Sequence, residues 1–349
     1  MISYISNGMN NKVKIGILGC ADIAKRYAIK AFQSIDNCEV VSIASRNPVK
    51  AKEWALDFNI QAEESYDSLL NNKDIDAVYI PLPVGLHKEW ALKAVAVGKH
   101  IICEKSLAED FESVKSIVSA CQSKGVVLYE NFMTDFHPQH QKVLSIIENG
   151  DIGEPFIFRS FFGFPPLKKD NIRYDSKLGG GCLNDVGAHI VFMARKIFKK
   201  EPVSVMCNLI NDKKLGVDTG GTAVLEFSDG QAALMGFSFC SSYQNNYSVW
   251  GSKAVLNVKQ AYSIRPDTKP IVELTQIQNY QEVVTQINAP SANQFEILFH
   301  DFCDTILNQE NRAEKINNIY LRLLAQAKVL EAMRLSALEN RMVEVKEIK

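Results

Sequence analysis

The sequence lacks the features that mark membrane-spanning, nucleic-acid-binding and disulfide-bonded proteins. Its 349 residues carry a formal net charge of -1, which leaves no basic stripe for a nucleic-acid backbone. No apolar run approaches the roughly 18 residues that a membrane span requires. The eight cysteines form no CxxC pair and no zinc-ligand spacing. These absences predict a globular protein of the reducing cytoplasm with free thiols, and neither nucleic acid nor membrane is expected as a partner.

The start of the chain, residues 1–12, is polar and has neither the charged beginning nor the apolar centre of a signal peptide, so we expect a loose tail there. Beyond it, the length and the 46% share of apolar residues favour two domains. Residues 13–131 alternate short apolar strands with amphipathic helices, as βαβ units do. The predicted strands are 13–18, 39–45, 76–82, 100–104 and 126–130. This pattern predicts a Rossmann-type, doubly wound parallel sheet in an α/β domain.

The pattern changes in the second part of the chain, where alternating and aromatic residues such as those of "FIFRSFFGF" replace the strand and helix alternation. Two alternating runs at 221–239 flank Asp229-Gly230, which is a strong hairpin signal. Further strands are predicted at 247–258 and 270–277, and helices at 293–308 and 315–337. Residues 132–349 are therefore predicted to form an α+β domain with a mainly antiparallel open sheet.

The segment "GILGCADIAKR" follows the first predicted strand and opens a predicted helix. A dinucleotide fold needs small residues at this point, so that the strand can turn tightly and its backbone can approach a pyrophosphate. The segment fits GxGxxA with alanine at the middle glycine. We therefore predict a cofactor-binding turn formed by Gly19, Cys20, Ala21, Asp22 and Ile23. A tight turn without any ligand is the alternative.

The end of the second strand indicates which dinucleotide binds. An acidic residue there would bond the ribose 2′-hydroxyl of NAD, whereas Ser45 and Arg46 offer a hydroxyl and a guanidinium that suit a 2′-phosphate. NADP(H) is therefore favoured over NAD(H). The alternative is that Arg46 is a solvated loop arginine.

The carboxyl ends of further strands are expected to face the cofactor, because open α/β sheets bind ligands beyond these ends. Glu104-Lys105 stands at one such end and "IPLPVGLH" at the preceding one. The residues assigned to the cofactor from strand ends are Pro81, Leu82, His87, Glu104, Lys105 and Asn131. For Lys105, a surface salt bridge with Glu104 is the alternative.

The segment "LGGGCLNDVGAHIVFMARKIF" carries Asp185 and His189 four residues apart, on one face of a predicted helix. A carboxylate and an imidazole so placed can hydrogen bond or address one substrate, and the preceding glycines allow close backbone approach. The alternative is a capping Asp185 and a satisfied, partly buried His189. No third ligand stands at a telling distance, and "HPQH" at 137–140 is typical of a helix start, so no metal is expected.

The chain resembles the glucose-fructose oxidoreductase and inositol dehydrogenase family, Gfo/Idh/MocA, in the segments "GILGCADIA", "PLPVGLHKEWALKAVAVGKHIICEKS", "ENFM", "GDIGEP" and "GGGCLNDVGAH". The resemblance covers nearly the whole chain. It implies that Lys105 is catalytic and touches both nicotinamide and substrate. It also implies that the segment from Asp185 to His189 supplies partner groups to that lysine.

Within the family, "VYIPLPVGLHKEW", "LYENFMTDFHPQH" and "PPLKKDNIRY" look like the NDP-sugar 3-ketoreductases of deoxysugar biosynthesis. This likeness implies an NADPH-dependent reduction of a keto group on a nucleotide-linked sugar, with substrate contacts at Arg173 and Tyr174. Dihydrodiol and aldose dehydrogenases have similar segments, so an NADP-dependent dehydrogenase of a free sugar, polyol or trans-dihydrodiol is the alternative. A non-catalytic NADP(H)-binding sensor is a third reading, against which the joint presence of Lys105, Asp185 and His189 argues.

Two positions depart from the pattern of this family. His189 stands where the ketoreductases often have tyrosine, and we expect it to donate the proton while Lys105 stabilises charge and Asp185 orients the donor. Ser106 stands where the family has a proline, often with a cis bond before it. A cis bond before a non-proline residue costs roughly 2.5 to 4 kcal/mol, so we expect the Lys105–Ser106 bond to be trans.

The resemblance also implies that the second domain, 132–349, binds substrate and mediates oligomerisation, so that the protein is a homo-oligomer, a dimer or tetramer. Family members commonly pair through the open face of the second-domain sheet. Strands between about residues 202 and 277 would supply that face here.

Overall fold

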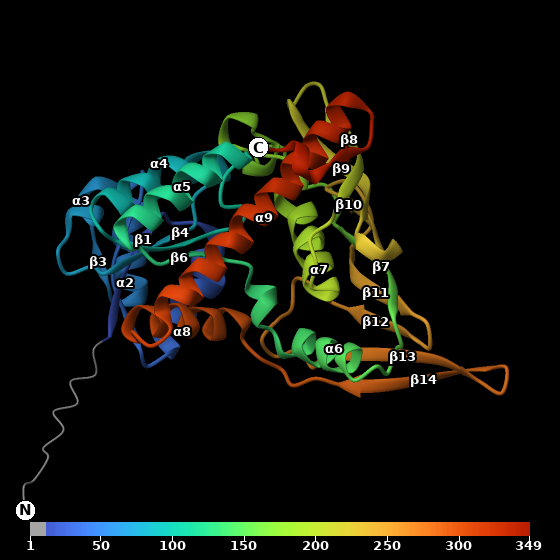
Figure 1. Cartoon of the computed structure of the whole chain (residues 1–349). Coiled ribbons are helices and arrows are strands. Elements are labelled where there is room, and N and C mark those ends of the chain that lie inside the picture. Colours follow the sequence, from blue (N-terminus) through green and yellow to red (C-terminus); the bar gives the residue numbers. More distant parts are fainter. Residues whose placement is uncertain (1–11) are drawn as a thin grey trace, which may run out of the picture.

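The computed structural model describes residues 12–349 and contains two sheets (Figure 1). The first part of the chain forms one sheet and the second part forms the other. The loose tail expected at 1–12 lies almost wholly outside the described residues. The first sheet has six parallel strands in the order β3-β2-β1-β4-β5-β6. The second has nine strands in the order β14-β13-β12-β11-β7-β10-β9-β8-β15, all antiparallel pairs except β10 with β7. The expected fold class, a doubly wound parallel sheet followed by a mainly antiparallel one, is confirmed.

The strands of the first sheet are short and apolar on both faces because helices cover both sides of the sheet. The strands are β1 Val13–Leu18, β2 Cys38–Ala44, β3 Gln61–Ala62, β4 Ala77–Ile80, β5 His100–Cys103 and β6 Leu128–Glu130. The helices of this half are α1 Ile29–Ser34, α2 Pro48–Phe58, α3 Tyr66–Asn71, α4 Val84–Ala96 and α5 Phe111–Lys124, with a π-helical turn at Ala24–Ala28 before α1. The short elements β3 and α3 were not predicted from the sequence.

Side-chain caps fix where two of these helices begin, and thereby shape the loops that follow the strands. Asn47 accepts hydrogen bonds from the backbone N–H groups of Val49 and Lys50, at 3.0 and 3.2 Å, just after β2. Asp110 accepts one from Ser113 at 2.7 Å, after β5. The residues between each strand end and its following helix are therefore held in defined loops at one edge of the sheet.

The second sheet consists of β7 Pro155–Gly163, β8 Ser204–Asp212, β9 Val217–Glu226, β10 Ala232–Ser238, β11 Gln244–Gly251, β12 Val255–Lys259, β13 Ile271–Gln278, β14 Gln281–Asn288 and β15 Val343–Glu344. The predicted hairpin is present: β9 and β10 pair with Glu226 opposite Ala232, around the turn at Ser228–Gly230. Strand β14 was not predicted. It forms with β13 a hairpin that projects beyond the rest of the molecule in Figure 1.

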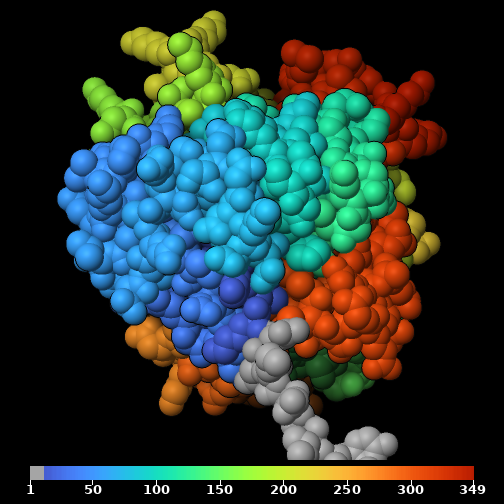
Figure 2. Space-filling view, turned by 90° about the vertical axis from the view of Figure 1, so that its left-hand side faces the viewer, coloured from blue at the N-terminus to red at the C-terminus, as the bar shows by residue number. Residues whose placement is uncertain are grey.

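One face of the second sheet is covered by helices, and Figure 1 shows none on the other. The helices of this half are α6 Pro138–Glu148, α7 Ala188–Phe198, α8 Gln294–Leu307 and α9 Arg312–Glu339, with a π-helical turn at Leu183–Gly187 before α7. Helix α8 packs against α1, and α9 packs against α5 as well as against β8. In Figure 2 these helices, in orange, lie directly beside the blue first half. Helices α8 and α9 of the second part of the chain thus pack against the first part. The domain boundary at 131/132 stays a prediction.

None of the helices within residues 12–349 combines the length and the apolar character that a membrane crossing needs. All eight cysteines, each of which lies in the described part of the chain, are free. Cys240 is exposed and Cys20 partly so, while the other six are buried.

Candidate active site

The turn after β1 has the geometry that close approach of a phosphate requires. Gly19 has φ 125°, and a Cβ placed on it would lie 2.9 Å from the side chain of Leu82. The turn is held by a 3.0 Å hydrogen bond from the Gly19 N–H to Ala44. After it, Cys20, Ala21 and Ile23 are partly buried and Asp22 is exposed, before the helix begins. This turn, followed by a helix N-terminus, fits a pyrophosphate group.

A second cation lies beside the residues predicted to bind the 2′-phosphate. Arg46 is exposed and Ser45 partly buried after β2. The Lys50 ammonium donates a 2.7 Å hydrogen bond to the carbonyl of Cys20, so it stands between the Gly19 turn and the end of β2. Sequence reasoning missed Lys50 because it considered only the residues directly at the strand end. Its place in the first turn of the following helix, four residues after Arg46, is the signal that could have identified it.

Glu104, at the end of β5, is partly buried and fixes the backbone that leads to Lys105. Its Oε1 accepts hydrogen bonds from the Tyr79 hydroxyl and from the amide of the buried Asn131, both at 2.5 Å. Burial raises the pKa of Glu104, although these two donors oppose that rise. Glu104 and Asn131 therefore lie together and support the lysine from the ends of neighbouring strands.

His87 is fully buried beneath the loops, where its ring nitrogens lie 2.9 Å from the carbonyl of Ser106 and 2.7 Å from that of Leu82. Burial lowers the pKa of His87, against the effect of these carbonyls. The ring thus ties the loop of Pro81 and Leu82 to the segment after Lys105. Because His87 is fully buried, it holds the loops that form the predicted cofactor surface and is not itself part of that surface.

Lys105, Asp185 and Arg173 form an ion-pair cluster, called the site cluster below. The Lys105 ammonium binds the Asp185 carboxylate and, at 2.9 Å, the main-chain oxygen of the same residue. Arg173 binds the second carboxylate oxygen through Nε. The side chains of Lys105 and Asp185 are only 11% and 17% exposed, and that of Arg173 is 38% exposed. Burial alone would raise the pKa of Asp185, but the charges of Arg173 and Lys105 outweigh it and hold this pKa well below its usual range.

His189 lies near this cluster, among aromatic rings. The ring centroids of Phe132 and Phe162 are each 5.6 Å away, and that of Tyr262 is 5.8 Å away. The buried Nδ1 of His189 has no hydrogen-bond partner, and no hydrogen bond joins His189 to Asp185 within residues 12–349. Burial first, and then the charge of Lys105, lowers the pKa of His189 to about 3. The imidazole is therefore neutral at physiological pH.

Tyr174 follows Arg173 and closes its own loop, because its hydroxyl accepts a 3.0 Å hydrogen bond from the Leu167 N–H. Its ring stands edge-on to Phe239, with centroids 6.1 Å apart. Of the residues predicted for the substrate, Lys105, Asp185 and Arg173 are in direct contact. Tyr174 adjoins this cluster without bonding to it.

The Lys105–Ser106 peptide bond is cis, so the expected trans bond is wrong. The expectation considered only the local cost of the bond. In the folded chain Ser106 is fixed by tertiary contacts: its hydroxyl donates to the Asn184 carbonyl at 2.8 Å, and its own carbonyl faces His87.

Comparisons with known proteins bear on this site. Residues 13–132 match an oxidoreductase family with an NAD-binding Rossmann fold, and residues 140–257 match the GFO/IDH/MocA C-terminal domain. A dTDP-3,4-didehydro-2,6-dideoxy-alpha-D-glucose 3-reductase of Saccharopolyspora spinosa is 34% identical over 82% of this chain and 85% of its own. A D-xylose 1-dehydrogenase (NADP(+)) of Haloferax volcanii is 35% identical over 72% of this chain and 77% of its own.

A solved structure is also similar over nearly the full length. The crystal structure of a 3-ketoreductase from Actinomadura kijaniata, in complex with NADP and TDP-benzene, is 32% identical to this chain. It covers 93% of this chain and 98% of its own, with a TM-score of 0.87. The likeness therefore extends over both sheets.

Proposed function

Because the chain belongs to the Gfo/Idh/MocA family of oxidoreductases, we propose that it uses NADPH to reduce a keto group on a dTDP-linked deoxysugar, as a 3-ketoreductase. The reductase of Saccharopolyspora spinosa and the 3-ketoreductase of Actinomadura kijaniata support this substrate class. The observation that carries the proposal is the contact of Lys105 with Asp185 at the carboxyl end of β5, on the same edge of the parallel sheet as the Gly19 turn.

NADP(H) is the cofactor that these residues fit. The Gly19 turn accepts a pyrophosphate, and Ser45, Arg46 and Lys50 surround the place where a 2′-phosphate would bind. When bound, NADPH supplies the hydride that reduces the carbonyl carbon.

Lys105 is the proton donor in this proposal. The sequence alone favoured His189, but its pKa of about 3 leaves the ring neutral and a poor acid at physiological pH. The Lys105 ammonium instead gives its proton to the carbonyl oxygen as the carbon accepts the hydride, so that the ketone becomes a secondary alcohol. Lys105 then regains a proton from solvent. The neutral His189 imidazole, which lies near Lys105, orients the substrate by hydrogen bonding.

Asp185 and Arg173 keep the donor in place. The Asp185 carboxylate holds the ammonium of Lys105 from one side, and Arg173 neutralises the remaining charge of that carboxylate. The guanidinium has further N–H groups besides the Nε that binds Asp185, and these suit an anionic or polyhydroxyl substrate. Tyr174 lines the same loop and offers its ring to the sugar.

The test is turnover of dTDP-3,4-didehydro-2,6-dideoxy-alpha-D-glucose with NADPH, followed by NADPH absorbance and by mass spectrometry of the product. We expect stoichiometric NADPH oxidation and a sugar that gains two hydrogen atoms. Isothermal titration with NADPH, followed by dTDP, UDP and GDP on the saturated protein, identifies the nucleotide. Lys105→Met is the matched control, which should bind NADPH and give no product.

A second candidate, oxidation of a free aldose, is favoured by the D-xylose dehydrogenase likeness. D-xylose with NADP+ in the same assay decides between the two. Reduction of NADP+ by xylose together with no affinity for any nucleotide would contradict the sugar-nucleotide proposal. Cofactor binding with no turnover in either direction would favour a sensor.

We also infer a homo-oligomer, a dimer or tetramer, that forms through the uncovered face of the second sheet. Strand alternation puts on this face the exposed apolar side chains Phe161, Met206, Leu234 and Trp250, and Phe156 joins them beside a register irregularity between β7 and β11. Phe156 and Trp250 pack edge-on with centroids 5.8 Å apart. Sedimentation of the wild type and of Trp250→Glu tests this, because a charge there should dissociate the assembly.

The free cysteines further favour a reducing compartment, the cytoplasm, which a fluorescent fusion would test.

A further inference from the structure

Two carboxylates outside the site cluster each accept a hydrogen bond from a backbone N–H close to one of its members. Glu130, the last residue of β6, accepts from the Leu107 N–H at 2.8 Å, two residues after Lys105. Asp218, near the start of β9, accepts from the Leu183 N–H at 2.6 Å, two residues before Asp185. One carboxylate thus comes from each sheet.

The surroundings of Asp218 are shaped for this contact. Gly181 has φ 135°, and a Cβ on it would lie 2.5 Å from Asp218 Oδ1. The glycine therefore leaves the space through which the carboxylate reaches the turn before α7. Asp218 faces the charge of Arg334 from α9, and burial raises its pKa while the Leu183 N–H opposes that rise.

Glu130 lies at a small cavity between the two halves of the chain, which Ser106, Leu107, Asp110, Gln326 and Arg334 help to line. The charges that face it are those of Lys105 and Arg195, which favour its ionised form, and of Glu104, which opposes it. Burial outweighs the favourable contacts and raises the pKa of Glu130 to about 7.

The two supported segments are also joined to each other. The Ser106 hydroxyl donates to the Asn184 carbonyl at 2.8 Å, and Arg334 donates to the Asn184 side chain at 2.5 Å. Lys105 and Asp185 therefore lie on two segments, each of which is held by one carboxylate, Glu130 or Asp218. A hydrogen bond from Ser106 to Asn184 joins the two segments.

We propose that Glu130 and Asp218 are positioning residues, which set the distance and direction between Lys105 and Asp185 by holding the backbone beside each of them. The inference rests on the proposed function, because it assigns these residues to the proton-donating pair of that reaction. Neither touches the substrate. Loss of either acceptor leaves an unpaired N–H and frees its segment to rotate, which moves the ammonium away from the carbonyl oxygen.

The first test compares two substitutions of Glu130. Glu130→Ala removes the acceptor, and we expect kcat to fall on the order of tenfold or more, with the NADPH Kd unchanged. Glu130→Gln keeps an acceptor oxygen for the Leu107 N–H, so it should restore most of kcat at neutral pH. In the wild type, kcat should decline as the pH falls through about 7, because protonation weakens this hydrogen bond, and Glu130→Gln should lack that decline.

Asp218→Ala and Asp218→Asn give the same comparison for the other segment. The matched controls are carboxylates on the same strands or their neighbours that face elsewhere. Asp301→Asn neutralises the carboxylate on α8 that accepts from the Tyr129 hydroxyl, next to Glu130 on β6, and Glu226→Gln neutralises a carboxylate at the far end of β9. Both controls should keep the wild-type kcat and pH profile.

A readout without substrate separates this proposal from the proposed function. The rate of reductive methylation of Lys105, followed by mass spectrometry, should rise in Glu130→Ala and Asp218→Ala and stay unchanged in both controls. A wild type that reduces no nucleotide sugar would refute the proposed function and leave this measurement valid. Unchanged Lys105 methylation in folded alanine variants would overturn the positioning role. If the alanine variants do not fold, a wild-type pH profile in Glu130→Gln would overturn it.

Discussion

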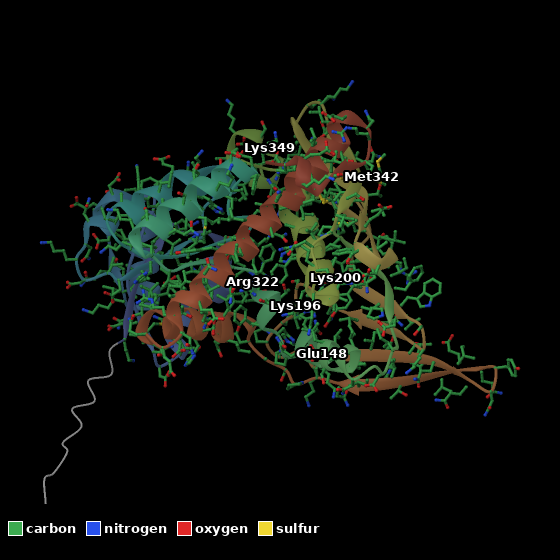
Figure 3. All side chains as sticks on the ribbon, in the orientation of Figure 1. Glu148, Lys196, Lys200, Arg322, Met342 and Lys349 are labelled. Carbon is green, nitrogen blue, oxygen red and sulfur yellow. The ribbon has the colours of Figure 1, made fainter. Side chains whose placement is uncertain are left out.

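Two ion-pair clusters of the same composition lie in the described part of the chain, and only one of them stands at the carboxyl end of a strand of the parallel sheet. Beside the site cluster there is a second, called the helix cluster, formed by Lys196, Asp135 and Arg322. Figure 3 labels Lys196 on α7 and Arg322 on α9, which both bind Asp135. In both clusters one aspartate binds a lysine and an arginine, and the lysine also donates to the main-chain oxygen of that aspartate.

The likeness extends to a buried histidine near each lysine. His189 lies near Lys105 and His140 near Lys196, and burial followed by the lysine charge lowers each pKa to about 3. The hydrogen bonds differ. The ring of His140 lies 2.9 Å from the Tyr247 hydroxyl and 2.9 Å from the Ala261 carbonyl, whereas the buried Nδ1 of His189 has no partner.

Because the two clusters share their ion pairs and a histidine with a lowered pKa, these features do not by themselves identify a catalytic site. The helix cluster joins three helical elements and satisfies its histidine, as structural polar groups do. The site cluster stands at the carboxyl end of a parallel strand, which is where ligands bind in such sheets.

The largest expected contrast is in turnover. Lys105→Met should lower kcat on the order of 10²- to 10⁴-fold, because it removes the general acid. Lys196→Met should leave kcat close to the wild-type value, because Lys196 binds only the helix cluster. Steady-state assays together with NADPH titration check both variants. Near-normal turnover of Lys105→Met would remove this lysine from the mechanism.

The first sheet was predicted well because strands covered on both faces are apolar along nearly their whole length, as Ala77–Ile80 is. Strand β14, with the polar sequence "QEVVTQIN", escaped prediction because it is exposed along nearly its whole length and pairs only as the arm of a hairpin. Strands are predicted from the alternation of apolar and polar residues that burial of one face produces. This signal is weak where a strand faces water on both sides.

The site could be predicted only in part. Lys105 and Asp185 were recognised, each from its own segment and from the family resemblance, but their contact arises from packing between segments 80 residues apart. Glu130 and Asp218 carried no local signal that named their partners, and Lys50 was indicated only by its place in the first helical turn after Arg46. The helix cluster was not foreseen, because its three residues lie on separate elements that meet only in the folded chain.

The next contrast is in stability. Lys196→Met leaves the Asp135 carboxylate, only 12% exposed, with Arg322 as its remaining partner. We expect the free energy of unfolding to fall by about 2 kcal/mol. Lys200→Met is the control: its pair with Asp229 is on the surface, and its loss should cost below about 1 kcal/mol. Equal denaturant midpoints for the two variants would refute a stabilising role of the helix cluster.

Acid should destabilise both clusters through their histidines. The folded pKa of about 3 lies below the ordinary 6.5, so the unfolded chain binds more protons between these values and stability falls as the pH decreases through this window. His189→Asn and His140→Asn should each make the unfolding free energy less steep against pH, by up to about 1.4 kcal/mol per pH unit. Urea unfolding near pH 5 and pH 6 measures this slope. His300→Asn, on the exposed surface of α8, is the control, and slopes unchanged in the two buried variants would disprove the assignment.

The smallest contrast separates the two histidines in catalysis. If Lys105 donates the proton and His189 only orients the substrate, His189→Asn should lower kcat/KM by roughly tenfold, the loss of one hydrogen bond to the substrate. The shape of the pH profile near neutrality should stay as in the wild type, because a ring with a pKa of about 3 does not titrate there. His140→Asn should leave kcat/KM unchanged. A loss in His189→Asn as large as that in Lys105→Met, with a changed pH profile, would instead make His189 the proton donor and restore the assignment that the sequence alone favoured.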